Sequence, residues 1–262
     1  MKKIVLYIKI VCLFLVLALT GCSATSFNDA QRERNGEAQS DFVKAAQLNI
    51  QLGLAYLDQD QVSRAKLKLN RAMKLAPELP EAHYGMAFYF DKVGEVEAAK
   101  KAYKHAIALH PKGGIEHNNY GTFLYRQKEY RAAEKEFLKA LKDPEYTNAA
   151  QAFENAGLCV LEIPDQARAI QYFKSALSHD PKCFKALLEL AYIEYFNKNV
   201  ETAMHYYSQY TQIAGATSRS LWLGITLARH FDDKNKASSD LLVLKDRFPF
   251  SKEYKDLIKH ES

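Results

Sequence analysis

A 34-residue period constrains the fold of this chain more than any other feature of its sequence. With Ala46 as position 1, later repeats begin at Pro80, Gly114, Ala150, Phe184 and Ser218. Position 20 is alanine in all six repeats, a match that chance does not produce. Periods of 20 to 50 residues indicate a stack of helical or sheet units rather than one globular core.

The residue types within a repeat indicate two antiparallel helices. Position 8 is small in the first five repeats and position 24 is large in all six, while a proline stands near position 32 in five of them. Small residues let the two helices approach, the large residue fills the gap to a neighbouring helix, and proline ends the second helix. A single repeat cannot bury its apolar face alone, so six repeats stack into a continuous core.

This spacing resembles the tetratricopeptide repeat. We therefore predict an all-α fold, a right-handed solenoid of about six helix pairs over residues 46–251 with a capping tail over 252–262. A six-repeat helical bundle that is not a solenoid is the alternative. Two repeats depart from the pattern, because Tyr210 and Gly215 are unusual in the fifth and the first helix of the sixth is shifted by one residue at Gly224.

The N-terminal residues carry a targeting signal. Lys2 and Lys3 precede an apolar run over residues 10–19, which is short for a membrane-spanning helix. The sequence then reads Leu-Thr-Gly-Cys up to Cys22 and resembles a bacterial lipobox, which implies cleavage after residue 21 and lipidation of Cys22. A retained transmembrane anchor is the alternative.

The residues after the lipobox predict a location and a tether. By the same resemblance, a residue other than aspartate at Ser23 implies sorting to the outer membrane, with the protein facing the periplasm. Residues 22–45 are polar and lack an apolar period, so we expect a lipidated N-terminus followed by a flexible tether.

Composition and motifs exclude several classes of function. The formal net charge is only +5 and no long basic block occurs, so we expect no nucleic-acid partner. No motif for a nucleophile, a metal or a phosphate is present, so we expect no catalytic residue, cofactor, metal or small-molecule substrate. His83 and His117 both stand at position 4 of their repeats, where a packing role is expected. Whether Cys159 and Cys183 pair stays open.

The resemblance to tetratricopeptide repeats also implies a binding groove lined by the first helix of each repeat. The side chains at the groove positions form an aromatic and aliphatic strip with amides near its middle, which suits a peptide or an amphipathic helix. Some of them could instead belong to the core. The candidate groove residues are Ile50, Leu54, Leu57, Tyr84, Phe88, Asn118, Asn119, Thr122, Tyr125, Asn155, Leu158, Tyr192, Tyr195 and Trp222, with Phe196 in the same register.

Some repeats of this type hold a partner's C-terminal carboxylate in a clamp of lysine and asparagine side chains. Asn118, Asn155 and Lys185 occupy three of the five clamp positions, but Thr122 and Glu189 occupy the other two. Because Glu189 would repel a carboxylate, we reject this binding mode.

The lipobox, the tether and six such repeats together resemble the PilF/PilW family of type IV pilus biogenesis lipoproteins. Residues 49–57, 220–229 and 247–249 carry the likeness best. The resemblance implies a pilotin, a lipoprotein that helps the outer-membrane secretin localise and assemble into its ring, with the secretin and the type IV pilus machinery as protein partners. The alternatives are a general periplasmic scaffold for cell-wall hydrolases or outer-membrane protein assembly, and an enzyme acting on wall glycan.

Overall fold

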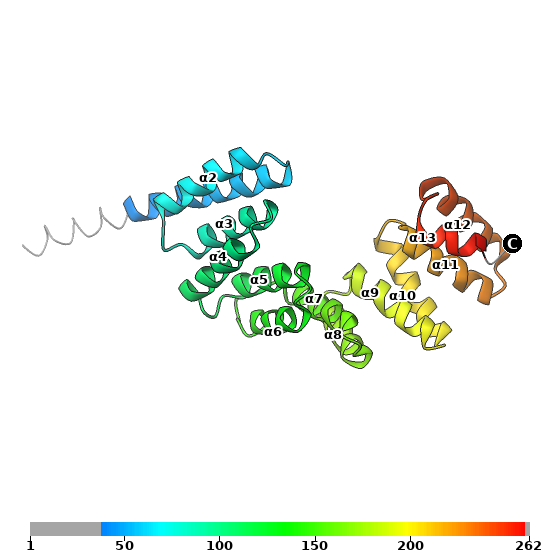
Figure 1. Ribbon diagram of the computed structural model, residues 1–262. Helices are drawn as coiled ribbons and strands as arrows, with labels where there is room; N and C mark the ends of the chain where they lie inside the picture. The colour runs from blue at the N-terminus through cyan, green and yellow to red at the C-terminus, as the bar shows by residue number, and fades with distance from the viewer. Residues whose placement is uncertain (1–37, 260–262) are drawn as a thin grey trace, which may run out of the picture. The chain divides into compact units, whose positions relative to one another are not determined.

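The computed structural model describes residues 38–259, and all regular elements among them are helices (Figure 1). The chain divides into two compact units, Met1–Leu109 and His110–Ser262. The first unit contains a helix over residues 38–58, followed by α2 (Val62–Leu75), α3 (Pro80–Lys92) and α4 (Val96–Leu109). The second unit contains α5 (Gly114–Arg126), α6 (Tyr130–Ala140), α7 (Ala149–Glu162), α8 (Gln166–His179), α9 (Phe184–Phe196), α10 (Val200–Ile213), α11 (Ser218–His230), α12 (Lys234–Arg247) and α13 (Lys252–Lys259).

The predicted repeat boundaries match the helix starts. Four first helices, α3, α5, α9 and α11, begin at the predicted first residue of a repeat, and α7 begins one residue earlier. The prediction of an all-α repeat fold is confirmed.

Both ends of the repeat region differ from the expectation. Residues 38–45, which we expected in the flexible tether, are already helical and continue into the first helix. At the other end, residues 252–259 of the expected tail form the helix α13. The N-terminal signal, the lipobox and the rest of the tether lie outside the described residues.

The glycines at position 8 make room for the large side chain at position 24 of the same repeat. A Cβ atom added at Gly157 would lie 2.6 Å from the Phe173 ring, and one added at Gly121 would lie 2.8 Å from the Phe137 ring. Both rings are almost completely buried. The small residue therefore leaves space for the ring at position 24 in addition to letting the two helices approach. We had predicted only the approach of the helices.

The turn between the two helices of a repeat uses a left-handed residue at position 15. Asp60, Lys128, Lys198 and Asp232 have φ values between 54° and 68°, and Gly94 has a φ of 79°. Non-glycine residues adopt this conformation at some cost, so the packing of the helix pair must hold them there. In the fourth repeat a proline stands at this position, and proline cannot adopt a positive φ.

Side-chain caps mark where several helices begin. Asp165 accepts the Arg168 N–H at 3.1 Å before α8. Thr217 and Ser220 form a reciprocal capping box before α11, with bonds of 3.1 Å and 2.9 Å. Such caps satisfy backbone donors that have no partner within the helix, and they favour a helix start at that residue.

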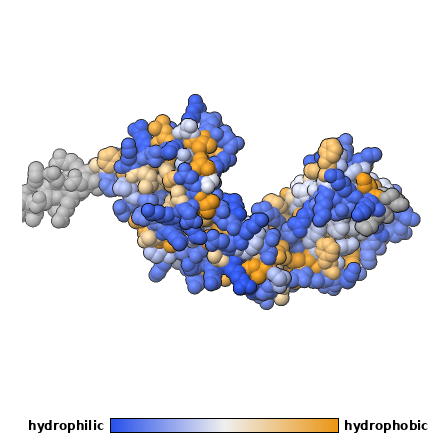
Figure 2. All heavy atoms as spheres, in the orientation of Figure 1, coloured by the Kyte–Doolittle hydropathy of each residue, from blue (hydrophilic) through white to orange (hydrophobic). Residues whose placement is uncertain are grey.

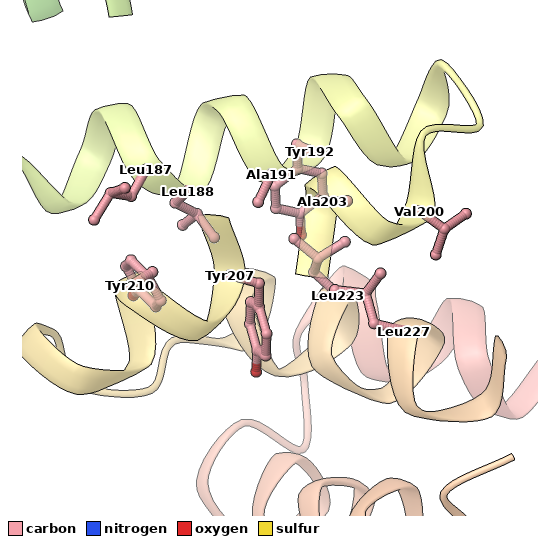
Figure 3. Packing of buried hydrophobic residues seen from close by; sticks show 10 residues of the cluster. All are labelled: Leu187, Leu188, Ala191, Tyr192, Val200, Ala203, Tyr207, Tyr210, Leu223 and Leu227. Atoms are coloured by element: carbon pink, nitrogen blue, oxygen red, sulfur yellow. The ribbon is translucent and has the colours of Figure 1, made fainter. Parts of the chain in front are cut away.

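Three consecutive helices of the second unit share one hydrophobic cluster (Figure 3). The side chains of α9, α10 and α11 point toward one another there, and Leu187, Ala203, Leu223 and Leu227 are fully buried. Tyr210 stands at position 27, where the first four repeats have alanine. Its ring is buried and its hydroxyl donates to the Gly215 carbonyl at 3.0 Å, so the two unusual residues of the fifth repeat contact each other.

The last helix covers the end of the stack in the second unit. Leu257 of α13 packs with Leu221, Ile225 and Leu244 in a buried cluster. The one-residue shift at Gly224 serves a different contact, because a Cβ there would collide with the Tyr207 hydroxyl of the preceding repeat. Terminal repeats need such covering elements, since one of their faces has no neighbour.

The face drawn in Figure 2 is mostly hydrophilic, with hydrophobic residues in separate patches on each unit. No helix within residues 38–259 has the length and apolar character that crossing a membrane requires.

A buried ion pair joins α5 and α6 and predicts a pH dependence. The His117 ring contacts Glu136 Oε2 at 2.6 Å through Nδ1 and the Pro111 carbonyl at 3.0 Å through Nε2. The Pro111 carbonyl and an ionised Glu136 carboxylate both accept, so an imidazole that carries both protons, and is therefore charged, donates to each of them. Burial alone would lower the pKa of His117, but its bonds to Glu136 and Pro111 raise it overall. Burial likewise acts to raise the pKa of Glu136, while His117 and Lys139 lower it overall.

We expect this pair to stabilise the protein most at mildly acidic pH. A raised histidine pKa gives stability that is present below the unfolded pKa and lost as pH rises through the folded pKa. A lowered glutamate pKa gives stability that is lost as pH falls through its folded value. Chemical denaturation between pH 5 and 9 should therefore show the wild type losing stability on the alkaline side of the histidine titration. Glu136→Gln should show a smaller loss, and an equal loss in both proteins would contradict the charged pair.

Candidate partner-binding surface

Polar contacts connect the first helices of consecutive repeats in the second unit. Asn155 Nδ2 on α7 donates to Asn118 Oδ1 on α5 at 3.5 Å. Lys185 Nζ on α9 donates to Glu154 Oε1 on α7 at 3.1 Å. Glu154 is buried and also accepts the thiol of Cys183 at 2.8 Å.

The same kind of contact joins α9 to α11. Arg219 binds Glu189 with both terminal nitrogens, and its Nη2 donates to Oε2 at 2.8 Å. The hydrogen bonds to Glu189 raise the pKa of the arginine. We call this row of cross-helix contacts the polar ladder; it consists of Asn118, Asn155, Glu154, Lys185, Glu189 and Arg219.

The polar ladder places α5, α7, α9 and α11 side by side, with their ladder side chains on one face. The ladder also pairs the lysine that a carboxylate clamp would need with a glutamate of the same chain. Lys185 is paired with Glu154, and Glu189 with Arg219. The rejected clamp therefore finds no free lysine at this position.

An aromatic cluster lies at the α9–α11 end of this face. Tyr192 stacks on Trp222 with ring centroids 5.9 Å apart and planes 6° apart. Phe196 stacks on Trp222 at 6.2 Å, and Tyr195 meets Trp222 edge-on at 6.0 Å. We call these four rings, Tyr192, Tyr195, Phe196 and Trp222, the aromatic cluster.

The four rings are exposed to different degrees. Phe196 is 62% exposed, Tyr195 and Trp222 are half-buried, and Tyr192 is buried. Tyr192 supports the others, because its hydroxyl donates to the Arg219 carbonyl and the Arg219 guanidinium lies 4.2 Å from its ring centroid. The cluster is therefore a rigid apolar platform that can bury a partner's side chain with little loss of conformational entropy.

The remaining predicted groove residues of α5 and α7 are partly available. Asn119, Tyr125 and Leu158 are half-buried, and Leu158 packs against the core. Thr122 donates to the Asn118 carbonyl at 2.9 Å, and Tyr125 meets Tyr130 edge-on at 5.4 Å.

In the first unit, part of the predicted strip belongs to the core. Ile50 and Leu57 are only 4% and 6% exposed and pack in buried clusters, which corrects their expected place in the groove. Leu54 is half-buried against the same clusters. Tyr84 and Phe88 are half-buried with ring centroids 6.4 Å apart, so their side chains retain some accessible surface.

Sequence reasoning missed the role of Arg219. It stands at position 2 of its repeat, as Lys185 does in the preceding repeat, and Glu189 stands at position 6 of that preceding repeat. Comparing the charges at these positions in neighbouring repeats would have found the pair. The predicted lipid-bearing Cys22 lies outside the described residues.

The described residues offer little for catalysis. No three His, Cys, Asp or Glu side chains in the described part of the chain gather as a metal site would require. Cys159 and Cys183 are free and buried, and burial raises the pKa of each thiol to about 12. A cavity of about 420 Å³ at the N-terminal ends of α7 and α9 is lined by polar side chains that include Glu154 and Lys185 of the polar ladder.

Comparison with known proteins identifies the family. The tetratricopeptide repeat model matches residues 84–150, 121–179 and 165–217. The type IV pilus assembly protein PilF of Pseudomonas aeruginosa is 34% identical over 242 residues, which cover 92% of this chain and 94% of PilF.

The chain belongs to the PilF/PilW family of tetratricopeptide-repeat proteins of type IV pilus biogenesis.

Solved structures support the fold of this PilF/PilW-family chain. A structure from a functional characterization of Pseudomonas aeruginosa pilF superposes with a TM-score of 0.79 at 34% identity, covering 84% of this chain and 99% of that one. The crystal structure of PilW, a widely conserved type IV pilus biogenesis factor, gives a TM-score of 0.70 at 24% identity, covering 81% and 98%. The relationship to PilF supports a role in type IV pilus biogenesis, in which such repeats mediate protein interactions.

Proposed function

We propose that this protein is a pilotin, an outer-membrane lipoprotein that binds secretin subunits and promotes their localisation and multimerisation. The observation that carries the proposal is the 34% identity to the type IV pilus assembly protein PilF along almost the whole of both chains. An adaptor needs a folded binding surface and a fixed location, and the chain offers a candidate for each.

The proposed location depends on the lipobox. Lipidation of Cys22 would hold the protein at the periplasmic face of the outer membrane, since each buried CH₂ of an acyl chain contributes about 0.8 kcal/mol. Holding one partner at a membrane raises its effective concentration for any subunit that must insert there. The protein would then act by binding and positioning, without turnover.

The proposed contact surface is the aromatic cluster beside the polar ladder. Exposed aromatic rings contribute strongly to protein interfaces, whereas the ladder side chains are already paired within the chain. An apolar side chain of a secretin segment would pack on Phe196 and Trp222. The half-buried amides and hydroxyls of α5 and α7 could bind the segment's backbone.

The anchor is tested by Cys22→Ala, with Cys12→Ala as the matched control because Cys12 lies in the apolar run of the predicted signal. We expect Cys22→Ala to leave the repeats folded but to remove the protein from the outer-membrane fraction. Secretin multimers there should fall at least about tenfold, as expected when effective concentration at the membrane is lost. Cys12→Ala should behave like the wild type.

Normal multimer levels with Cys22→Ala would contradict the pilotin proposal. Isolating the membrane complex in mild detergent and identifying its partner distinguishes the pilotin from a general periplasmic scaffold. A secretin partner supports the proposal, whereas a cell-wall hydrolase or a barrel-assembly partner would favour the general periplasmic scaffold.

A further inference from the structure

The helix over residues 38–58 has two apolar faces. One face carries Ala46 and Ile50 into a buried cluster of the first unit. On the other face, Leu48 is 59% exposed and Leu52 is 45% exposed. At about 100° per residue, these two leucines point almost directly away from Ile50.

Two alanines extend the exposed leucines into a stripe along the helix. We call it the outer stripe, and it consists of Ala45, Leu48, Leu52 and Ala55. The spacing of three, four and three residues is that of a seam between two packed helices. In a stack of repeats, a face of this kind normally packs against a helix of the neighbouring repeat. The exposed leucines show that no other described helix covers it here.

The outer stripe reads the same in both directions about residue 50. An antiparallel copy of the helix, related by a two-fold axis at this residue, would place Leu48 against the second copy's Leu52. The same rotation would place Ala45 against the second copy's Ala55, and small residues there let the helices approach. It would also bring Lys44 within one helical turn of the second copy's Asp58, an opposite charge. A self-complementary patch is what a two-fold interface requires.

We propose that the outer stripe is a self-association surface, on which the first helix of a second copy of this chain packs antiparallel. Four side chains per copy form a small interface against the roughly 1,200 Å² of a stable complex, so the dimer should be weak and concentration-dependent. This contact lies in the first unit and is separate from the proposed secretin contact of the second.

The register is tested with two cysteine variants of the full-length protein, purified in detergent. In the proposed dimer, residue 45 of one copy faces residue 55 of the other. Two copies of residue 45 lie about 15 Å apart along the helix axis, which is too far for a disulfide. Mild oxidation of a mixture of Ala45→Cys and Ala55→Cys should give at least about fivefold more linked dimer than either variant alone. The native cysteines are present in all samples and give the same background.

A second measurement tests association without cross-linking. The sedimentation-equilibrium mass of the wild type should rise toward twice that of one chain as concentration increases, and Leu48→Glu should abolish the rise. Leu48 is exposed, so helix content by circular dichroism should not change. A constant monomer mass would overturn the proposal and would indicate that another segment of the chain or a different partner covers the stripe. Equal cross-linking in the mixture and in a single variant would overturn the antiparallel register.

Discussion

Phe173→Ala should destabilise the second unit by about 3–5 kcal/mol, the usual cost of removing a large ring from a packed core. Phe173 is fully buried, and its ring fills the space that Gly157 leaves open on the facing helix. Truncation would leave a cavity lined by two helices of one repeat and by side chains of the next. Urea denaturation followed by circular dichroism measures the loss.

The matched control is Phe250→Ala, the same substitution at a side chain that is 85% exposed. It should change stability by no more than about 0.5 kcal/mol. If both variants lost the same stability, or if Phe173→Ala cost less than about 1 kcal/mol, the position-24 rings would not hold the helix pairs together as described.

Phe196→Ala should weaken secretin binding about 30-fold, in line with the roughly 2 kcal/mol that an aromatic anchor contributes to an interface. Phe196 is 62% exposed, so the substitution should leave the unfolding transition almost unchanged. Trp222 is the single tryptophan of the chain and lies within the aromatic cluster. Its fluorescence therefore reports on a ligand that reaches the cluster, and titration with purified secretin measures the affinity.

The control for this experiment is Phe184→Ala, which changes a similarly exposed phenylalanine at the opposite end of the same helix. It should bind as the wild type does. Equal binding by Phe196→Ala would show that the secretin contacts another surface. Failure of the wild type to bind would contradict the pilotin proposal itself.

The 34-residue period was sufficient to predict the helix pairs, because the packing of every pair requires the same residue types at the same positions. The alanine at position 20 is buried in every repeat, from Ala65 to Ala237, so a larger residue there would collide with the facing helix. In four of the six repeats the predicted first residue is also the first residue of a helix. Such positions are constrained by neighbours at a fixed sequence separation, and a single sequence shows that constraint.

The groove was harder to predict, because a residue's position in the repeat does not show whether its side chain faces a partner or lies in the hydrophobic core. Ile50 and Leu57 stand at groove positions but are buried in the two hydrophobic clusters of the first unit. The start of the helix that carries them was also missed, although Val43, Ala46 and Ile50 already follow a helical spacing. Polar residues around Val43 concealed this signal.

The polar ladder has a consequence for how the repeats can be ordered. Glu189 is buried against Arg219 of the next repeat, and Glu154 against Lys185 of the next. Only the fifth and sixth repeats carry a cation at position 2, so the fourth or fifth repeat placed before any other repeat would leave its carboxylate without one. A buried unpaired charge is strongly unfavourable. The charges thus restrict which repeat can follow which, and rearranged arrays that separate a buried glutamate from its cation should fold poorly even where their apolar contacts still match.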